Sequence, residues 1–527
     1  MADKNVFDQP QAATLTHDEA PSAIAHLTSD RSFFGHPRGL RTLFFTEVWE
    51  RFSFYGIRPL LVLFMTAALA NGGFAFSREA ASAIVGIYAS SVYLASLPGG
   101  WIADRWLGLR RAIFWGGVLI ALGHLSIALS AVFAHKAFFL GLILIVMGTG
   151  LLKPNVSALV GPLYPEGGPR RESGFAIFYM GINLGAFVAP LLTGPLSENV
   201  GWHWGFGVAG VGMLIGLLTY RANSPKTLGP LGLNPSVGPA QQRTVRNATI
   251  VGVGVLAIIV ALAMAGVIPV NPVAIAQRMT IVIGILALAY FTYLFFFAGL
   301  TRDELKRAVV ILVLFLFSAT FWSAYEQAPT SLNLFGRDFT DRTILGWEMP
   351  TLWLQSVTPF FVITLSPVFA AIWLALGKRN IDLSSPAKFA FALFAAGLSY
   401  LVMVSATNHV ISGGGVGVRV SVLWLILTYF LQVIGELCLS PVGLSSVTAL
   451  APKRFIGQMM GVWFMSISLG NLVAGLLGGN VDPEKLNEMP LLFQRTAFTL
   501  FAAAAMLALL IVPIRKMMAS RDSEKTS

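Results

Sequence analysis

Residues 80–111 read AASAIVGIYASSVYLASLPGGWIADRWLGLRR, and this segment indicates what kind of protein the chain is. Its first part, 80–103, is almost free of charge and slightly longer than the roughly 20 apolar residues that a helix needs to cross a bilayer. Its last part, 104–111, contains one aspartate and three arginines. A long apolar run that ends in a short basic segment is typical of a transmembrane helix followed by a cytoplasmic loop.

The composition of the whole chain agrees with this interpretation. Of 527 residues, 55% are hydrophobic and 12% are charged, whereas about 25% of the residues of a soluble domain are charged. These values exclude a soluble enzyme, a disordered protein and a repeat solenoid, and they leave a polytopic membrane protein. The net charge of +11 does not indicate a nucleic-acid partner, because the basic residues lie in loops between apolar runs. The single cysteine, Cys438, excludes an internal disulfide and is expected to be a core residue.

Hydropathy predicts fourteen transmembrane helices. Eleven stretches are apolar and long enough to span, or nearly so: 80–103, 112–134, 173–196, 204–220, 247–277, 279–301, 309–325, 350–377, 389–408, 455–481 and 496–514. Three more fit if a few buried charges are accepted: about 41–70, 137–161 and 420–446. An even number of spans places both termini on one side of the membrane.

The distribution of basic residues predicts which side that is. With both termini inside, 25 of the 36 Lys and Arg residues fall in inside segments, eight fall outside and three lie within spans. A threefold excess over short loops favours two cytoplasmic termini. The expected lipid environment is a bacterial inner membrane, by analogy with proteins that have similarly short loops.

The chain divides into five segments on the same grounds. We expect a flexible cytoplasmic tail over 1–40, six helices over 41–222, a linker with two extra helices over 223–301, six further helices over 302–516 and a short cytoplasmic tail over 517–527. The linker is rich in Pro, Gly and Leu, and the two extra helices are nearly free of charge. The predicted fold is therefore all-α, with two six-helix bundles and two additional spans.

The loop at 99–111 resembles a motif of the major facilitator superfamily, Gly-x-x-x-Asp-Arg-x-x-Gly-Arg-Arg, although Leu109 precedes the paired arginines here. A second basic join, Gly-Lys-Arg at 377–379, occupies the equivalent place in the second half, as expected for parallel repeats. The resemblance implies that Asp104 and Arg105 belong to a loop on the gate side and do not contact substrate.

Charged residues inside spans are the strongest functional signal, because burying a charge in a membrane is costly. The first span contains EVWERFSFYGIR at 47–58. At about 100° per residue, one face of a helix carries Glu47, Arg51, Phe54 and Arg58, and Glu50 and Tyr55 flank that face. Capping of the cytoplasmic end explains Glu47 on its own, but it does not explain Arg58, about three turns further along.

Other charges interrupt later spans. Lys153 lies in the fourth span. When the two extra helices are left out of the count, Glu326 lies at the end of the seventh span and Glu436 in the tenth. Each buried carboxylate needs a partner or a proton. Cations in the first half and carboxylates in the second would give a cavity with opposite walls, which suits a zwitterion with separated charges. Four aromatic residues are candidates for the lining of such a cavity: Tyr55, Tyr93, Trp322 and Trp463.

Signals for membrane-embedded catalysis are missing from the sequence. It contains no His-Glu-x-x-His zinc motif, no Gly-x-Ser-x-Gly and no Gly-x-x-x-x-Gly-Lys phosphate loop. His124 is a lone histidine in an apolar span, and a packed side chain is the favoured interpretation. We therefore expect neither an enzyme nor a metal or organic cofactor.

Two signatures identify the chain as resembling the proton-dependent oligopeptide transporter family. EVWERFSFYG at 47–56 is similar to Glu-x-x-Glu-Arg-Phe-x-Tyr-Tyr-Gly, and FYMGINLG at 178–185 is similar to Phe-Tyr-x-x-Ile-Asn-x-Gly. Supporting matches are KPN at 153–155, GWHWGF at 201–206 and the pair Trp322 and Glu326. The resemblance covers about 38–515. It implies proton-driven import of di- and tripeptides by a major facilitator fold that functions as a monomer.

The resemblance also implies roles for individual residues. Proton coupling would involve Glu47, Glu50, Arg51, Lys153 and Glu326. The peptide carboxylate would bind Arg58 and Lys153, its amine would bind Asn183 and Glu436, and Glu326 would pair with Arg58. Tyr55, Tyr93, Trp322 and Trp463 would line the pocket, with Ser466 nearby.

Two departures concern selectivity. Phe54 replaces the tyrosine that usually follows Phe-x in the first motif, and Thr358 stands where related sequences often have Asn. Rival functions remain open at this point. A proton-coupled carrier of nitrate or another small organic anion is one, although Glu436 would repel a simple anion. A drug exporter is the other, and the direction of flux would distinguish it.

Overall fold

The computed structural model describes residues 19–379, 383–415 and 417–518. This part of the chain contains fourteen helices of 20 to 32 residues. They are α2 (Arg38–Thr66), α3 (Arg78–Ile102), α4 (Leu109–Ala128), α5 (Ser130–Val160), α6 (Gly168–Asn199), α7 (Trp202–Leu228), α8 (Pro239–Met264), α9 (Pro272–Phe296), α10 (Arg302–Tyr325), α12 (Val357–Lys378), α13 (Ser385–Ser412), α14 (Leu423–Leu450), α15 (Ile456–Gly478) and α16 (Met489–Met518). Together they confirm the all-α prediction with fourteen long helices.

Thirteen of these helices are apolar enough over their length to cross a membrane. The remaining one is α2, which has the length of a span but concentrates four charges at Glu47, Glu50, Arg51 and Arg58. These side chains are all buried inside the protein, where other helices and not lipid surround them. The mean hydropathy of α2 is therefore too low to mark it as a span, because buried charges lower the value although lipid does not surround them.

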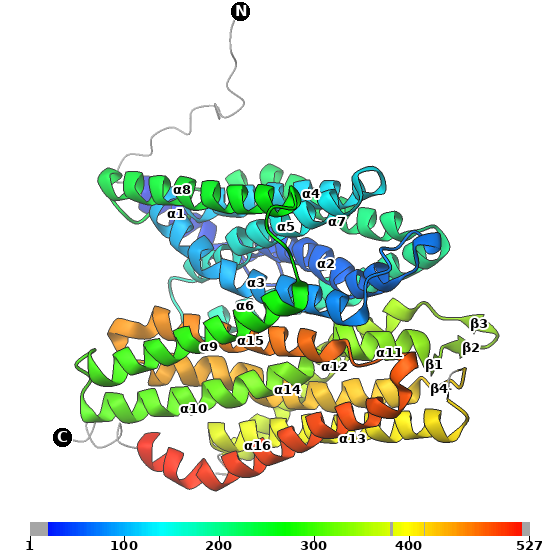
Figure 1. The fold of residues 1–527 in the computed structure, drawn as a ribbon. Coiled ribbons are helices and arrows are strands. Elements are labelled where there is room, and N and C mark those ends of the chain that lie inside the picture. Colours follow the sequence, from blue (N-terminus) through cyan, green and yellow to red (C-terminus); the bar gives the residue numbers. More distant parts are fainter. Residues whose placement is uncertain (1–18, 380–382, 416, 519–527) are drawn as a thin grey trace, which may run out of the picture.

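The long helices form two layers (Figure 1). Helices α2 to α7 make the upper layer in that view, and α10 to α16 make the lower one. Helix α9 packs against α3 in one layer and against α10 and α15 in the other, and α8 lies on the upper layer against α3. The two extra helices thus lie outside both helix groups, and α9 contacts both groups.

The two extra helices differ from the predicted ranges. The sequence predicts spans at 247–277 and 279–301, whereas α8 ends at Met264 and α9 begins at Pro272. The break comes from Gly266, which has φ +78°, and from Asn271, whose side chain accepts a hydrogen bond from the backbone N–H of Ala274 at 3.1 Å. Arg278, which falls between the two predicted spans, therefore lies in the second turn of α9. Hydropathy does not detect this break because 265–277 is almost as apolar as the helices.

A similar correction applies to the third and fourth spans. The predicted range 112–134 ends beyond α4, which stops at Ala128, and its last residues begin α5. The turn between the two helices is very tight, because Leu129 alone separates them. Apolar residues continue through this turn, so composition gives no boundary there.

Part of the predicted flexible tail is structured. Residues Glu19–Ser29 form helix α1, and Phe33 and His36 form a β-bridge just before α2. Arg170 of α6 donates hydrogen bonds to the carbonyl oxygens of Thr28 and Asp30, at 3.1 and 2.8 Å. This segment therefore packs on the first helix group. The predictions for 1–18 and for 519–527 lie outside the described residues.

One end of the molecule carries all four short strands of the described residues (Figure 1). Strand β1 (Thr340–Asp341) pairs in parallel with β4 (Val420–Ser421), and β2 (Thr343–Ile344) pairs with β3 (Trp347–Glu348) as a hairpin. Helix α10 leads to this end through a π-helical turn, η4 (Ala328–Leu332), and the short helix α11 (Asn333–Asp338). We call it the strand end.

Candidate functional site

The first candidate group is a buried ion cluster on α2. Arg51 pairs with Glu50, and its Nε atom lies 3.2 Å from Oε1 of Glu47. All three side chains are at most 3% exposed. One carboxylate oxygen of each glutamate accepts no hydrogen bond from the described residues. Two carboxylates thus share one guanidinium, and a proton arriving at either of them would remove an uncompensated negative charge.

Phe54 lies next to this ion cluster. Its ring is 5.2 Å from the guanidinium carbon of Arg51 and 5.7 Å from that of Arg58. It also stacks on Tyr88 of α3, with ring centroids 5.8 Å apart. Phe54, which replaces a tyrosine of the family motif, therefore provides an aromatic face between two arginines.

Arg58 joins the two helix groups. Its Nη2 atom pairs with Glu326, the residue that follows α10, and donates a hydrogen bond of 2.7 Å to Oδ1 of Asn471 in α15. The side chains of Arg58 and Glu326 are 8% and 6% exposed. The pairing agrees with the resemblance. Asn471 was missed, and the available signal was an amide within an otherwise apolar span.

Lys153 approaches the α2 cluster from α5. Its ammonium lies 4.2 Å from the centroid of the Tyr93 ring, in cation–π contact. Its charge interacts electrostatically with Glu47, Glu50 and Arg51, but within the described residues it takes part in no ion pair shorter than 4.0 Å. Lys153 is therefore a cation with an aromatic neighbour and no fixed carboxylate partner.

Glu436 of α14 has a partner that the sequence did not reveal. Tyr325, at the end of α10, donates a hydrogen bond from its hydroxyl to Oε2 of Glu436. Tyr55 of α2 interacts electrostatically with Glu436, with Glu326 and with both nearby arginines, so it lies among charges from both helix groups. The Glu436 carboxylate is thus held near Tyr55, as the Glu326 carboxylate is.

Asn183 is placed on α6, and its amide donates a hydrogen bond of 3.1 Å to the carbonyl oxygen of Tyr179. Tyr179 in turn interacts electrostatically with Glu436. The residues predicted to bind an amine, Asn183 and Glu436, therefore come from opposite helix groups with Tyr179 associated with both. No direct hydrogen bond joins them among the described residues.

The predicted aromatic lining is less uniform. Tyr93 and Tyr55 are half-buried, and Tyr93 stacks on Phe464 of α15 at 6.4 Å. Trp322 is 6% exposed, and its indole N–H has no partner in the described part of the chain. An unpaired buried donor is costly unless a ligand or water satisfies it, so Trp322 is suited to contact a bound molecule.

Trp463 and Ser466 lie deeper inside the second helix group. Trp463 is 3% exposed and packs where Gly443 of α14 leaves room, because a Cβ at Gly443 would lie 2.0 Å from the indole ring. The Ser466 hydroxyl is fully buried, 2.9 Å from that of Ser318 and 2.7 Å from the Trp463 carbonyl oxygen. In this conformation Ser466 offers no free group to a ligand, and its predicted role stays a prediction.

The predicted gate loop continues α3 as a π-helical turn, η2 (Ala103–Leu107). The carbonyl oxygen of Asp104 accepts hydrogen bonds from the Ser236 backbone N–H and hydroxyl, at 2.8 and 2.9 Å. The guanidinium of Arg105 lies 6.0 Å from the Trp101 ring. The linker that follows α7 therefore holds this loop. Its gating role stays a prediction.

Two further residues have the packing roles that the sequence favours. His124 is 2% exposed, and its Nε2 atom lies 2.5 Å from the Ser53 hydroxyl. Cys438 is buried and unpaired. No group of three or more potential metal ligands occurs among the described residues.

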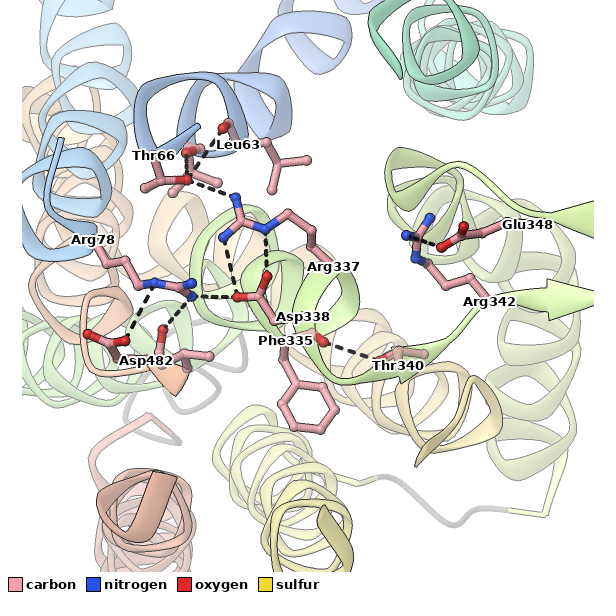
Figure 2. Close-up of polar contacts among 12 residues, drawn as sticks. Leu63, Thr66, Arg78, Phe335, Arg337, Asp338, Thr340, Arg342, Glu348 and Asp482 are labelled. Atoms are coloured by element: carbon pink, nitrogen blue, oxygen red, sulfur yellow. Dashed lines mark hydrogen bonds and ion pairs between the residues drawn. The ribbon is translucent and has the colours of Figure 1, made fainter. Parts of the chain in front are cut away.

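A second network closes the strand end, where it joins the two helix groups (Figure 2). Arg78 at the start of α3 bonds Asp338 at 2.6 Å and lies 3.8 Å from Asp482, which follows α15. Arg337 bonds the other oxygen of Asp338 at 2.7 Å and donates to the Thr66 hydroxyl at 2.9 Å. Figure 2 shows Arg342 and Glu348 as a separate pair. These contacts hold the strand ends of both groups together.

Comparison of the sequence with models of known protein families identifies one match. Residues 110–488 match the POT family. The chain belongs to the POT family. Members of this family are secondary active transporters and not enzymes, which agrees with the sequence prediction.

Curated relatives of this POT chain have similar length. Peptide transporter YePEPT of Yersinia enterocolitica is 50% identical over 503 residues, which cover 94% of this chain and 98% of the relative. The di-/tripeptide transporter of Lactococcus lactis subsp. lactis is 39% identical over 84% of this chain and 90% of its own length.

Solved structures confirm the fold. Peptide transporter POT in complex with sulfate gives a TM-score of 0.85 to this chain, at 39% identity over 94% of this chain and 99% of the other. A variant of it in complex with alafosfalin gives 0.85 at 40% identity, covering 95% and 99%. The POT chain therefore has the fold of these transporters along almost its entire length.

Proposed function

We propose that this protein is a proton-coupled symporter that imports di- and tripeptides by alternating access. The observation that carries the proposal is the ion pair between Arg58 and Glu326, which joins the two helix groups beside the buried Glu47, Glu50 and Arg51. A titratable cluster next to a charge pair that bridges two movable halves is the arrangement that coupling requires. The names of the relatives favour peptides over nitrate, other small anions or drugs as cargo.

The carboxylate of the peptide binds Arg58 and Lys153 in this proposal. Lys153 supports the assignment because it has no fixed carboxylate partner, and Arg58 becomes available when Glu326 is protonated. Asn183 and Glu436 bind the terminal amine, which is supported by their position on opposite helix groups near Tyr179. A zwitterion then spans the cavity, with its anionic end toward the first half and its cationic end toward the second.

Proton movement changes which ion pairs exist. A proton that arrives at Glu326 neutralises the carboxylate that holds Arg58, so the guanidinium is released to bind the peptide. A proton at Glu47 or Glu50 similarly weakens the hold on Arg51. Because leaving one partner of a buried pair unpaired costs about 3–5 kcal/mol, each proton and the peptide favour each other's binding.

Side-chain recognition is assigned to the aromatic residues. Tyr55, Tyr93 and Trp322 contact the peptide directly, and Trp463 with Ser466 shapes the site from the second helix group. Main-chain groups of the peptide provide most of the binding, so side-chain preference is broad. Phe54 and Thr358 adjust that preference through packing, and Asp104 with Arg105 takes part in opening on the side away from the strands.

The strand end is the outer end in this proposal. Both termini are then cytoplasmic, in a bacterial inner membrane, and the monomer is the transporting unit. Residues 41–222 and 302–516 form the two bundles that rock against each other, and 223–301 adds α8 and α9. The Arg78 network supports a conformation closed to the outside.

Uptake of dialanine into liposomes that contain the purified protein tests this function. An inward proton gradient should drive accumulation, and Glu47→Gln should abolish accumulation while peptide exchange between equal concentrations continues. A membrane potential of about 100 mV adds about 2.3 kcal/mol per proton, or roughly 50-fold accumulation for one proton.

Glu166→Gln is the matched control, because Glu166 is a solvent-exposed carboxylate that pairs with Arg170 outside the spans. This variant should accumulate dialanine like the wild type. Peptide movement that ignores the proton gradient in the wild type would contradict symport. Absence of any peptide movement by folded protein would contradict the peptide assignment, and nitrate and exported drugs would be assayed next.

A further inference from the structure

A groove with both polar and apolar lining lies on the second helix group, outside the site described above. It has a volume of about 570 Å³ and opens between α10, α15 and α16 near the strand end. Its lining includes Glu488, the residue just before α16, and Arg495, which lies seven positions further along in that helix. None of the residues assigned to peptide or proton binding lines it.

Arg495 is a cation on the surface of a membrane-spanning helix. It lies six residues after the first residue of α16, about 9 Å along the axis, and its side chain is exposed. Within the described residues it forms no ion pair, although a charge facing lipid is costly. An anionic group from outside the protein would lower that cost.

Glu488 supplies the opposite charge in the same groove. Lys485 interacts with it electrostatically but is paired with Glu79, at 3.3 Å. Glu488 and Arg495 form no ion pair with each other in the described structure. The groove therefore presents separated charges of opposite sign at the level where α16 enters the membrane.

The polar wall between these charges consists mainly of hydrogen-bond acceptors. The hydroxyls of Thr320 and Thr499 donate to carbonyl oxygens of their own helices, at 3.0 and 2.8 Å, and the Asn480 amide donates to Leu477 at 3.1 Å. Their oxygen lone pairs remain to accept hydrogen bonds. Leu477 and Leu491 add apolar surface that suits an acyl chain.

We propose that this groove binds the headgroup of an outer-leaflet phospholipid that carries a primary amine, of the phosphatidylethanolamine type. Arg495 binds the phosphate by charge-assisted hydrogen bonds. The ammonium donates its three N–H groups to Glu488 and to the acceptor wall, and one acyl chain follows the apolar part of the groove. Phosphatidylcholine matches the charges but has no N–H to donate, so the groove discriminates between the two lipids.

Native mass spectrometry of the purified full-length protein tests the proposal. Delipidated protein is mixed with phosphatidylethanolamine or phosphatidylcholine of identical acyl chains, and bound lipid is counted. The wild type should retain the primary-amine lipid about tenfold better, the value of one charge-assisted hydrogen bond. Glu488→Gln should remove this preference, and Arg495→Gln should lower retention of both lipids.

Arg278→Gln is the matched control. Arg278 is also an exposed arginine six residues after the start of its helix, α9, but it lies outside the groove, so its loss should leave the lipid preference unchanged. Equal retention of both lipids by the wild type would overturn the proposal. So would wild-type retention by Arg495→Gln, since that arginine would then simply extend toward water.

Competition by soluble phosphoethanolamine distinguishes a groove that binds a lipid from one that binds a small zwitterion. Phosphoethanolamine should compete poorly, because it lacks the acyl chain, and equal competition would overturn the assignment to lipid. If Arg495→Gln does not fold, the wild type and Glu488→Gln still decide the question. Because lipid retention is read without any transport assay, failure here is independent of failure of the proposed peptide symport.

Discussion

At the scale of single residues, Arg58 and Lys153 have the same charge but different surroundings. Arg58 is held by Glu326 and by Asn471, whereas Lys153 contacts the Tyr93 ring and has no ion-pair partner among the described residues. A buried guanidinium that is held in an ion pair must first lose that partner before it binds a ligand. The ammonium of Lys153 therefore meets an incoming carboxylate at lower cost.

This difference predicts the effect of Lys153→Gln. The variant should bind dialanine at least tenfold more weakly, because a charge-assisted hydrogen bond contributes about 1.5–3 kcal/mol. It should bind dialanine amide, which lacks the carboxylate, no more weakly than the wild type does. Competition against a labelled peptide measures both affinities.

Lys306→Gln serves as the comparison for this variant. Lys306 is a half-exposed lysine that pairs with Asp303 at the opposite end of α10 from Glu326. It should bind both ligands like the wild type. An equal loss for dipeptide and amide in Lys153→Gln would show that Lys153 acts through packing and not through the carboxylate.

At the scale of elements, the contact between α3 and α15 depends on two glycines. A Cβ placed on Gly86 would lie 2.8 Å from the Asn471 carbonyl oxygen and 2.9 Å from the Gly475 Cα. These are backbone atoms, which do not move aside as a flexible side chain would. The two helices approach so closely that Ser90 and Ser468 also share a hydrogen bond of 2.5 Å.

Gly86→Ala should therefore destabilise this conformation. Inserting a methyl group into a packed interface costs about 1–3 kcal/mol, more than alanine contributes as a better helix former. We expect a lower melting temperature in detergent. Gly252→Ala on α8, where nothing lies within 4 Å, should melt at or above the wild-type temperature. Equal melting of both variants would show that the α3–α15 contact adapts without cost.

At the scale of the whole molecule, the two helix groups are joined near the strand end by charges from distant parts of the chain. Arg78, Asp338 and Asp482 come from three separate elements and are between 16% and 18% exposed. Partly exposed pairs of this kind contribute about 1 kcal/mol each. Such a contribution is large enough to bias an equilibrium between two arrangements and small enough to be reversed in a transport cycle.

Asp338→Asn should increase opening of the strand end about fivefold, which corresponds to about 1 kcal/mol. A Ser82→Cys reporter measures this, since Ser82 is fully buried near that end and the native Cys438 is also buried. The rate of labelling by an impermeant thiol reagent should rise in Asp338→Asn.

Glu348→Gln changes a neighbouring acidic residue that pairs with Arg342 apart from the network (Figure 2), and labelling should stay at the wild-type rate. Combining Asp338→Asn with Arg78→Gln should raise labelling by less than the sum of the two single effects, because both changes remove the same Arg78–Asp338 pair. Fully additive effects would show that the pair does not hold the strand end closed.

Sequence by itself determined the helical class, the fourteen spans, the family and the residues that carry unusual charge. These features are local, because hydropathy and the 3.6-residue period of a helix act over neighbouring positions, and the α2 motif lies within a few turns. The same locality explains the errors at 265–277 and near Leu129, where apolar residues continue through a turn.

Tertiary structure alone decided which partner each buried charged group has. Asn471 is 413 residues from Arg58 in sequence, and Tyr325 is 111 residues from Glu436, so no periodic pattern links either pair. It also decided that Ser466 faces Ser318 and that Phe54 lies between two arginines. A buried charge requires a partner by electrostatics, but the choice of that partner depends on how helices pack across the interface of the two groups.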